Sequence, residues 1–164
     1  MNNSKSRRIR NIVTIVLVVF GFLFVVLSIA ADDLGIDLTP GFGIIQMIGF
    51  LIGLTFLTLG AFLFLHARRP KDAPRSLQAE ISTRLMATGL VLAYVTGMSD
   101  LIGIGTHVAP SFERPFVGPI QLGGILLGIG LIVFGLVLYY TSRGQRESSS
   151  LGFLVTEKKD GPQQ

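Results

Sequence analysis

Four long apolar stretches constrain this chain more than any other feature of its sequence. They cover about Asn11–Ala31, Phe42–Leu65, Ile81–Ser99 and Val117–Tyr140. A helix needs roughly 20 apolar residues to cross a bilayer, and lipid offers no hydrogen-bond partner to open backbone groups, so helices are the expected spanning form. The stretches are too long and too uniformly apolar for barrel strands. The sequence therefore predicts an all-α integral membrane protein with four transmembrane helices.

The third stretch is the weakest of the four. Arg84 and Asp100 bracket only fifteen residues, so the Arg84 side chain is expected to extend toward the lipid headgroups. Glu80 lies four residues before Arg84, where the two side chains share a helix face and can pair. Tyr139 and Tyr140 stand where interfacial anchors of the last helix would lie.

The charges of the chain are few and lie mostly on one side of the predicted membrane. Only 15% of residues are charged, against about 25% in soluble proteins, and mean hydropathy is +0.63. Basic residues precede the first helix (Lys5, Arg7, Arg8, Arg10), surround the middle loop (Arg68, Arg69, Lys71, Arg75, Arg84) and follow the last helix (Arg143, Arg146, Lys158, Lys159), while Arg114 lies on the opposite side. Since positive charge stays cytoplasmic, we predict cytoplasmic N and C termini and a multi-pass protein of the cell (inner) membrane.

The same distribution bears on partners. The net charge of +4 is interpreted as a topology signal and not as a nucleic-acid interface; anionic lipid headgroups are the expected counterpart. The basic N-terminus, the apolar run and the small residues before Ala30 also resemble a signal peptide, but the run from Ile12 to Ala31 is longer than a usual signal core. We therefore expect the first helix to be retained.

An internal duplication organises the chain. A shift of 75 residues aligns 40–68 with 115–143 and gives ten identities in twenty-nine positions, where composition alone predicts roughly three. The first and third helices align at a shift of 68, which pairs Gly21 with Gly89 and Asp32 with Asp100. Because each unit crosses the membrane twice, the two units have the same orientation, and we expect a pseudo-two-fold axis along the membrane normal.

This duplication predicts the organisation of the chain. Residues 1–10 form a basic cytoplasmic tail, 11–69 the first repeat, 70–80 a cytoplasmic linker, 81–144 the second repeat and 145–164 a flexible cytoplasmic tail. The linker is short, charged and rich in proline.

Stripes of small residues follow one face of each helix. On the even helices they are Gly49, Gly53 and Gly60, repeated as Gly124, Gly128 and Gly135. Such stripes let helix backbones approach closely in lipid, so these six glycines are predicted to pack helices inside each hairpin. One stripe could instead face a second subunit and form a homodimer.

Two glutamines and two aspartates are the candidate polar site. Gln46 and Gln121 lie one turn inside the outer boundary, and an amide there needs a partner. The first interpretation is a hydrogen bond to another helix, with Ser28 or Thr96 as acceptor or donor. Asp32 and Asp100 follow the odd helices in Asp-x-x-Gly segments typical of turns. The alternative is an outer pocket built from Asp32, Asp100, Gln46 and Gln121.

Motifs for catalysis are missing from the sequence. There is no cysteine, which excludes disulfides and thiolate metal sites, and there is no zinc-protease, hydrolase or phosphate-loop motif. We therefore predict no enzyme activity, no cofactor and no metal. The leading hypothesis is an accessory, scaffold or self-associating membrane subunit. Its expected partners are the lipid bilayer and either a second copy of the chain, in a homodimer, or another protein of a membrane complex. The alternatives are a small-solute or ion permease with an acidic outer mouth and, third, a membrane enzyme acting on lipid-like substrates.

Overall fold

The computed structural model describes residues 3–31, 33–35, 43–69, 77–99 and 118–142. Within these ranges the chain forms four helices, α1 (Asn3–Ala30), α2 (Ile44–Ala67), α3 (Leu77–Gly97) and α5 (Pro119–Thr141). Three of them, α1, α2 and α5, contain segments of 26, 24 and 23 residues that are long and apolar enough to cross a membrane. The prediction of a helical membrane protein is confirmed at this level.

Helix α3 differs from the other three. It has 21 residues, which at 1.5 Å per residue is about the thickness of the hydrocarbon core. Its first two turns carry Glu80 and Arg84 together with polar side chains, so it is less apolar than its neighbours. A fourth membrane crossing therefore stays a prediction that rests on the sequence.

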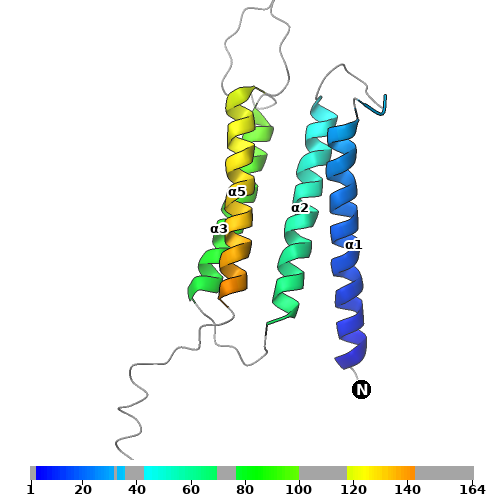
Figure 1. Ribbon diagram of the computed structural model, residues 1–164, viewed down its shortest axis with the longest axis vertical. Helices are drawn as coiled ribbons and strands as arrows, with labels where there is room; N and C mark the ends of the chain where they lie inside the picture. The colour runs from blue at the N-terminus through cyan, green and yellow to red at the C-terminus, as the bar shows by residue number, and fades with distance from the viewer. Residues whose placement is uncertain (1–2, 32, 36–42, 70–76, 100–117, 143–164) are drawn as a thin grey trace, which may run out of the picture.

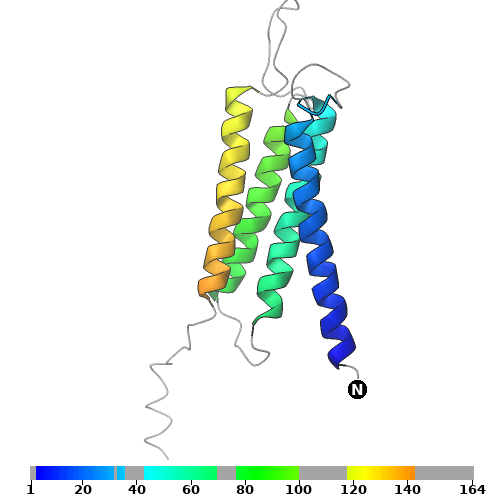
Figure 2. The same cartoon turned by 45° about the vertical axis from the view of Figure 1, so that its right-hand side comes forward.

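The helices form two antiparallel hairpins that lie side by side (Figures 1 and 2). Helix α1 packs along α2, and α3 packs along α5, over most of their lengths. The hairpins meet through α2, which touches both α3 and α5 through far fewer residues. Helices α1 and α5 lie at opposite ends of this row in Figure 2, whereas α3 and α5 overlap in Figure 1.

A small apolar core lies where the hairpins meet. It contains the buried side chains Met47, Leu51 and Leu54 of α2, Ala93 of α3, and Ile125 and Ile132 of α5. Most other large apolar side chains point outward; Phe22 and Ile29 of α1, for example, are 62% and 61% exposed. In a membrane, lipid tails replace water as the surroundings of outward faces that no other helix covers.

The helix ends are set by local residues. Gly43 and Gly118 precede α2 and α5 in extended conformation as N-caps, and Pro119 occupies the first turn of α5, where a missing N–H is harmless. After α1, the Leu34 N–H donates to the Ala30 carbonyl at 3.0 Å. The next residue, Gly35, has φ 65°, a left-handed conformation that favours glycine. A turn therefore ends the first helix at the predicted Asp-x-x-Gly segment.

Candidate functional site

Glycines let the backbones of the first hairpin touch. A Cβ atom on Gly53 would lie 2.8 Å from the Gly21 carbonyl oxygen and 2.9 Å from the Val25 nitrogen. A Cβ atom on Gly21 would lie 2.8 Å from the Leu57 nitrogen and 2.9 Å from the Gly53 carbonyl oxygen. Because the obstructing atoms are backbone atoms, no side-chain rotation could relieve either contact. The two glycines therefore fix how closely α1 and α2 approach.

The second hairpin has the same contact at the corresponding positions. A Cβ atom on Gly128 would lie 2.6 Å from the Gly89 carbonyl oxygen and 3.0 Å from the Ala93 nitrogen. In return, a Cβ atom on Gly89 would lie 2.5 Å from the Gly128 carbonyl oxygen and 3.0 Å from the Ile132 side chain. Gly21 and Gly89 are 68 positions apart and Gly53 and Gly128 are 75 apart, the shifts that align the two halves of the sequence.

The remaining glycines of the two stripes accommodate side chains of the facing helix. Gly49 lies against Ser28 and Gly124 against Thr96, so one hydroxyl residue fills each gap. Nearer the other end of the bundle, Gly60 lies against Val18 and Gly135 against Met86. We name the contact Gly21–Gly53 with its flanking glycines the first seam, and the contact Gly89–Gly128 with its flanking glycines the second seam. Both seams lie inside a hairpin.

Gln46 and Gln121 act as helix caps. The Gly43 N–H donates to Gln46 Oε1 at 2.7 Å, and the Gly118 N–H donates to Gln121 Oε1 at 2.8 Å. Each glutamine is the third residue of its helix and reaches back to an N–H that has no partner inside the helix, which is half of a capping box. A duplicated glutamine therefore has a duplicated local role.

Gln121 also joins two helices. Its Nε2 donates to Ser99 Oγ, just beyond the end of α3, at 2.7 Å. The sequence-based expectation of a bond between helices is met here, but Ser99 takes the place of the expected Thr96. The Thr96 hydroxyl donates instead to the Leu92 carbonyl at 2.7 Å, inside its own helix.

The other two members of the candidate polar site cannot be placed. Asp32 and Asp100 lie outside the described residues, as do the loop residues His107 and Glu113. The neighbouring Asp33 is described and exposed. Among the described residues no three His, Cys, Asp or Glu side chains come together as a metal site requires.

Hydroxyl side chains inside the helices mostly satisfy their own backbone. Thr14, Thr58 and Ser82 are buried, and each donates to the carbonyl oxygen four residues earlier. This back-bonding lets a hydroxyl lie in an apolar helix without a second polar group. These polar residues therefore need no ligand to account for them.

Two polar contacts between the hairpins could not be predicted from the sequence. Thr55 Oγ1 and Tyr94 Oη lie 2.9 Å apart, and the Thr55 hydroxyl donates to the Leu51 carbonyl at 2.8 Å. Since threonine has one hydroxyl proton, Tyr94 is the donor to Thr55. His66 Nδ1 and Tyr139 Oη form the other bond, also at 2.9 Å.

Tyr139 corrects one expectation. It was expected at the lipid interface beside Tyr140, but it is only 3% exposed, whereas Tyr140 is 59% exposed. The Tyr139 ring packs against Phe62, with 5.3 Å between ring centroids. Adjacent residues of a helix point about 100° apart, so only one of a tyrosine pair can face lipid fully. The polar partner of Tyr139, His66, lies on a different hairpin, which no spacing in the sequence indicates.

Comparison with protein-family models, with curated proteins and with solved structures finds no match to this chain.

Proposed function

We propose that this protein is a non-enzymatic membrane subunit that works by packing, as an accessory, scaffold or self-associating component of a membrane assembly. The observation that carries the proposal is the pair of seams. Among the described residues, Gly21–Gly53 and Gly89–Gly128 hold helices together at positions where an added side chain would meet the backbone of the facing helix. The polar side chains among them cap helices or bond to backbone. Such an arrangement suits a role in assembly better than a role in chemistry.

A topology with four crossings and both termini in the cytoplasm accompanies this proposal. Antiparallel packing brings the start of α1, the end of α2 and the start of α3 to one end of the bundle (Figure 1). That end carries the described basic residues Lys5, Arg7, Arg8, Arg10, Arg68, Arg69 and Arg84. The positive-inside tendency then favours a cell membrane protein with this end in the cytoplasm, where it meets anionic lipid headgroups.

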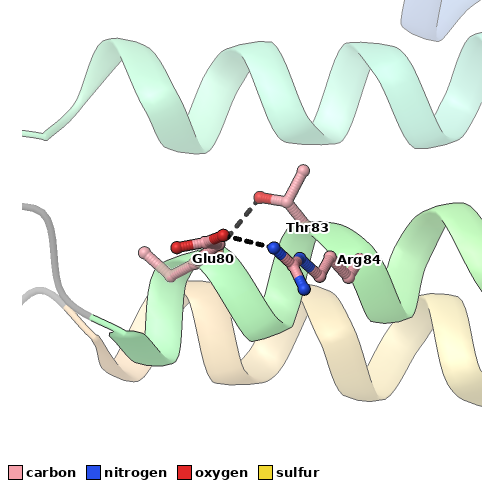
Figure 3. A network of polar contacts seen from close by, with 4 residues as sticks. Glu80, Thr83 and Arg84 are labelled. Carbon is pink, nitrogen blue, oxygen red and sulfur yellow. Dashed lines mark hydrogen bonds and ion pairs between the residues drawn. The ribbon is translucent and has the colours of Figure 1, made fainter.

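The start of α3 fits a crossing helix at the headgroup level. Arg84 donates to Glu80 at 2.6 Å, and both side chains are largely exposed (Figure 3). Beside them, Thr83 donates to the Ala79 carbonyl at 3.0 Å. Pairing neutralises the two charges at the point where the helix would enter lipid, and it confirms the expected Glu80–Arg84 contact. The remaining α3 residues up to Gly97 carry no charge.

We further propose that the two hairpins are tandem copies of one unit, related by an axis along the membrane normal. The support is the agreement of contacts with sequence shifts. In the first hairpin the seam glycines are Gly21, Gly53 and Gly49. Their neighbours occupy the positions that correspond to the neighbours of Gly89, Gly128 and Gly124 in the second hairpin. The two glutamine caps add a further agreement.

The test is to extract the protein in patches of its own membrane, without detergent, and to measure the mass of the complexes. We expect either a defined multiple of the 17.7 kDa chain or a fixed ratio of this chain to a second protein. A single chain alone would contradict the proposal, and solute uptake into vesicles by that lone chain would favour the permease. Replacing Asp32 and Asp100 together by Asn distinguishes the permease, because only a permease with the acidic mouth would then lose uptake while the folded chain persists.

A further inference from the structure

Equivalent faces of α2 and α5 have different environments. On α2, Met47 and Leu51 are buried against the second hairpin, each at 1% exposure. Thr58, seven residues after Leu51 and on the same helix face, is 8% exposed. The residues 75 positions later on α5 are Leu122, Leu126 and Val133, and they are 51%, 58% and 53% exposed. Gly130 and Val137 continue the same exposed row. We name this row, Leu122, Leu126, Gly130, Val133 and Val137, the α5 open face.

The odd helices show the complementary difference. Helix α3 presents Leu90, Tyr94 and Gly97 toward α2, where Tyr94 bonds to Thr55 and Gly97 lies against Met47 and Leu51. The residues 68 positions earlier are Phe22, Val26 and Ile29 of α1, and they are 62%, 41% and 61% exposed. We name these three residues the α1 open face.

The two open faces are the unused halves of one contact. Within the chain, the face of α2 that contains Met47 and Leu51 meets the face of α3 that contains Tyr94 and Gly97. The α5 open face corresponds to this face of α2, and the α1 open face corresponds to this face of α3. They do not meet in one chain, because α1 packs along α2 and α5 packs along α3, and α1 and α5 lie at opposite ends of the row in Figure 2. An exact two-fold relation between the hairpins would instead bring α5 against α1. The observed packing differs from that exact two-fold arrangement, and it therefore leaves one face of each kind free for another copy.

We propose that a second copy of this chain binds with its α1 open face against the α5 open face of the first, repeating the α2–α3 contact between molecules. The proposal rests on the proposed assembly function and on the tandem relation of the hairpins. A second copy is the occupant that fits, since it carries the complementary face at the same depth and in the same membrane orientation. The contact is heterologous, so successive copies form a ring or a chain.

The side chains of the open faces suit an apolar version of the internal contact. Gly130 replaces Thr55 and Val26 replaces Tyr94, so the polar pair of the internal contact becomes an apolar pair. Gly130 has no atom of another residue near its Cβ position, which leaves room for the Val26 that stands where α3 has Tyr94. Ile29, which stands where α3 has Gly97, would lie against Leu122 and Leu126, the counterparts of Met47 and Leu51. In lipid, such filling of small-residue gaps drives helix association.

Engineered cysteines can test this contact without interference, because the chain has no cysteine of its own. One copy carries Leu126→Cys and a differently tagged copy carries Ile29→Cys, expressed together in membranes and treated with a mild oxidant. Leu126 and Ile29 correspond to Leu51 and Gly97, which touch inside the chain. We expect a disulfide-linked pair of differently tagged chains, severalfold above the yield from the control pair Leu127→Cys and Leu27→Cys, which are exposed on other faces.

A chain with both Leu51→Cys and Gly97→Cys shows that oxidation works, since it should lose both thiols to an internal link. If this internal link forms but the yield of disulfide between Leu126→Cys and Ile29→Cys chains does not exceed the control yield, the proposal is overturned. Disulfides found only between two Leu126→Cys chains would also overturn it. If the mass measurement still gives a stoichiometric complex, the assembly function stands and only the α5–α1 contact falls. If it gives a lone chain, both fall.

Discussion

The two helices of one hairpin touch through their backbones, whereas the two hairpins touch through large side chains. Inside a hairpin, Gly53 faces the Gly21 carbonyl and Gly128 faces the Gly89 carbonyl. Between hairpins, Met47 and Leu51 pack against Ala93, Ile125 and Ile132. The polar contacts described there include the hydrogen bonds Thr55–Tyr94 and His66–Tyr139 and the Arg69 guanidinium over the Tyr139 ring.

This difference teaches which contacts the sequence must preserve. A backbone contact tolerates only glycine, because added atoms meet carbonyl and amide groups that cannot rotate away. A side-chain contact tolerates other apolar residues of similar volume, because neighbours can repack. The hairpins are therefore expected to behave as stiff units joined by a more adaptable contact.

The largest effect is expected from Gly53→Leu or Gly128→Leu. Either leucine would push the helices of its hairpin apart and should destabilise the protein by about 3 kcal/mol or more, at the upper end of overpacking changes. Unfolding titration with sodium dodecyl sulfate, followed by energy transfer between dyes on the two helices, measures the change.

Gly123→Leu is the matched control, because a Cβ atom at Gly123 has no neighbour within 4 Å. It should leave the second hairpin as stable as the original chain. Equal destabilisation by Gly123→Leu and Gly128→Leu would mean that the second seam does not limit the approach of α3 and α5.

Leu51→Ala should have the next largest effect, because Leu51 is 1% exposed in the contact between hairpins. Removing its side-chain atoms leaves a cavity, and we expect a loss of about 2 kcal/mol in the free energy that holds the hairpins together. The counterpart Leu126→Ala removes the same atoms from a position that is 58% exposed and should change the stability of the single chain little. Energy transfer between dyes on α2 and α3 measures the separation of the hairpins. If Leu51→Ala and Leu126→Ala lose similar amounts of free energy in single, unassociated chains, the contrast between the buried and the exposed position is wrong.

Gln121→Leu should have a smaller effect that comes from one end of the bundle. It removes the cap on the Gly118 N–H and the bond to Ser99, and we expect about 1–2 kcal/mol in total. Ser99→Ala removes only the bond to α3 and should account for less than half of that loss. Hydrogen exchange at the start of α5 should accelerate in Gln121→Leu but not in Ser99→Ala, and acceleration in both would argue against a capping role.

The smallest effect is expected from Tyr94→Phe. This change removes one hydrogen bond to Thr55 and keeps the ring, so a loss of about 0.6 kcal/mol is expected for a bond between helices in a membrane. A double-mutant cycle with Thr55→Val isolates the pair. A coupling energy near zero would show that the Thr55–Tyr94 bond adds nothing to the side-chain packing between the hairpins.

Features that depend on composition or periodicity could be predicted from the sequence. Long apolar runs predict helices because lipid enforces internal backbone hydrogen bonding, and the ends of α2 and α5 agree with the predicted stretches within about two residues. Helix α1 instead begins at Asn3, within the segment predicted as a basic tail. The pairing of Glu80 with Arg84 follows from helical spacing alone. The spacing of the glycine stripes similarly specifies a face, though it does not specify which helix that face meets.

Features that depend on how the hairpins meet could not be predicted. The bonds Thr55–Tyr94 and His66–Tyr139 join residues 39 and 73 positions apart, and no repeat or motif relates them. The local role of Gln46 and Gln121 was open to prediction, because each lies three residues after a glycine at a helix start. Their position near the outer boundary pointed to a bond across helices, and Gln121 forms such a bond, to Ser99.

The claim that each hairpin is a stiff unit can be tested by distance measurements between spin labels. The labels are attached to introduced cysteines, since the chain has none of its own. Spin labels on α1 and α2 report the first hairpin, and labels on α2 and α3 report the contact between hairpins, each in the original chain and in Leu51→Ala. We predict that Leu51→Ala broadens the α2–α3 distance distribution and leaves the α1–α2 distribution narrow. If the α1–α2 distribution broadens equally, the hairpins are not independent units held by glycine seams, and the account is wrong.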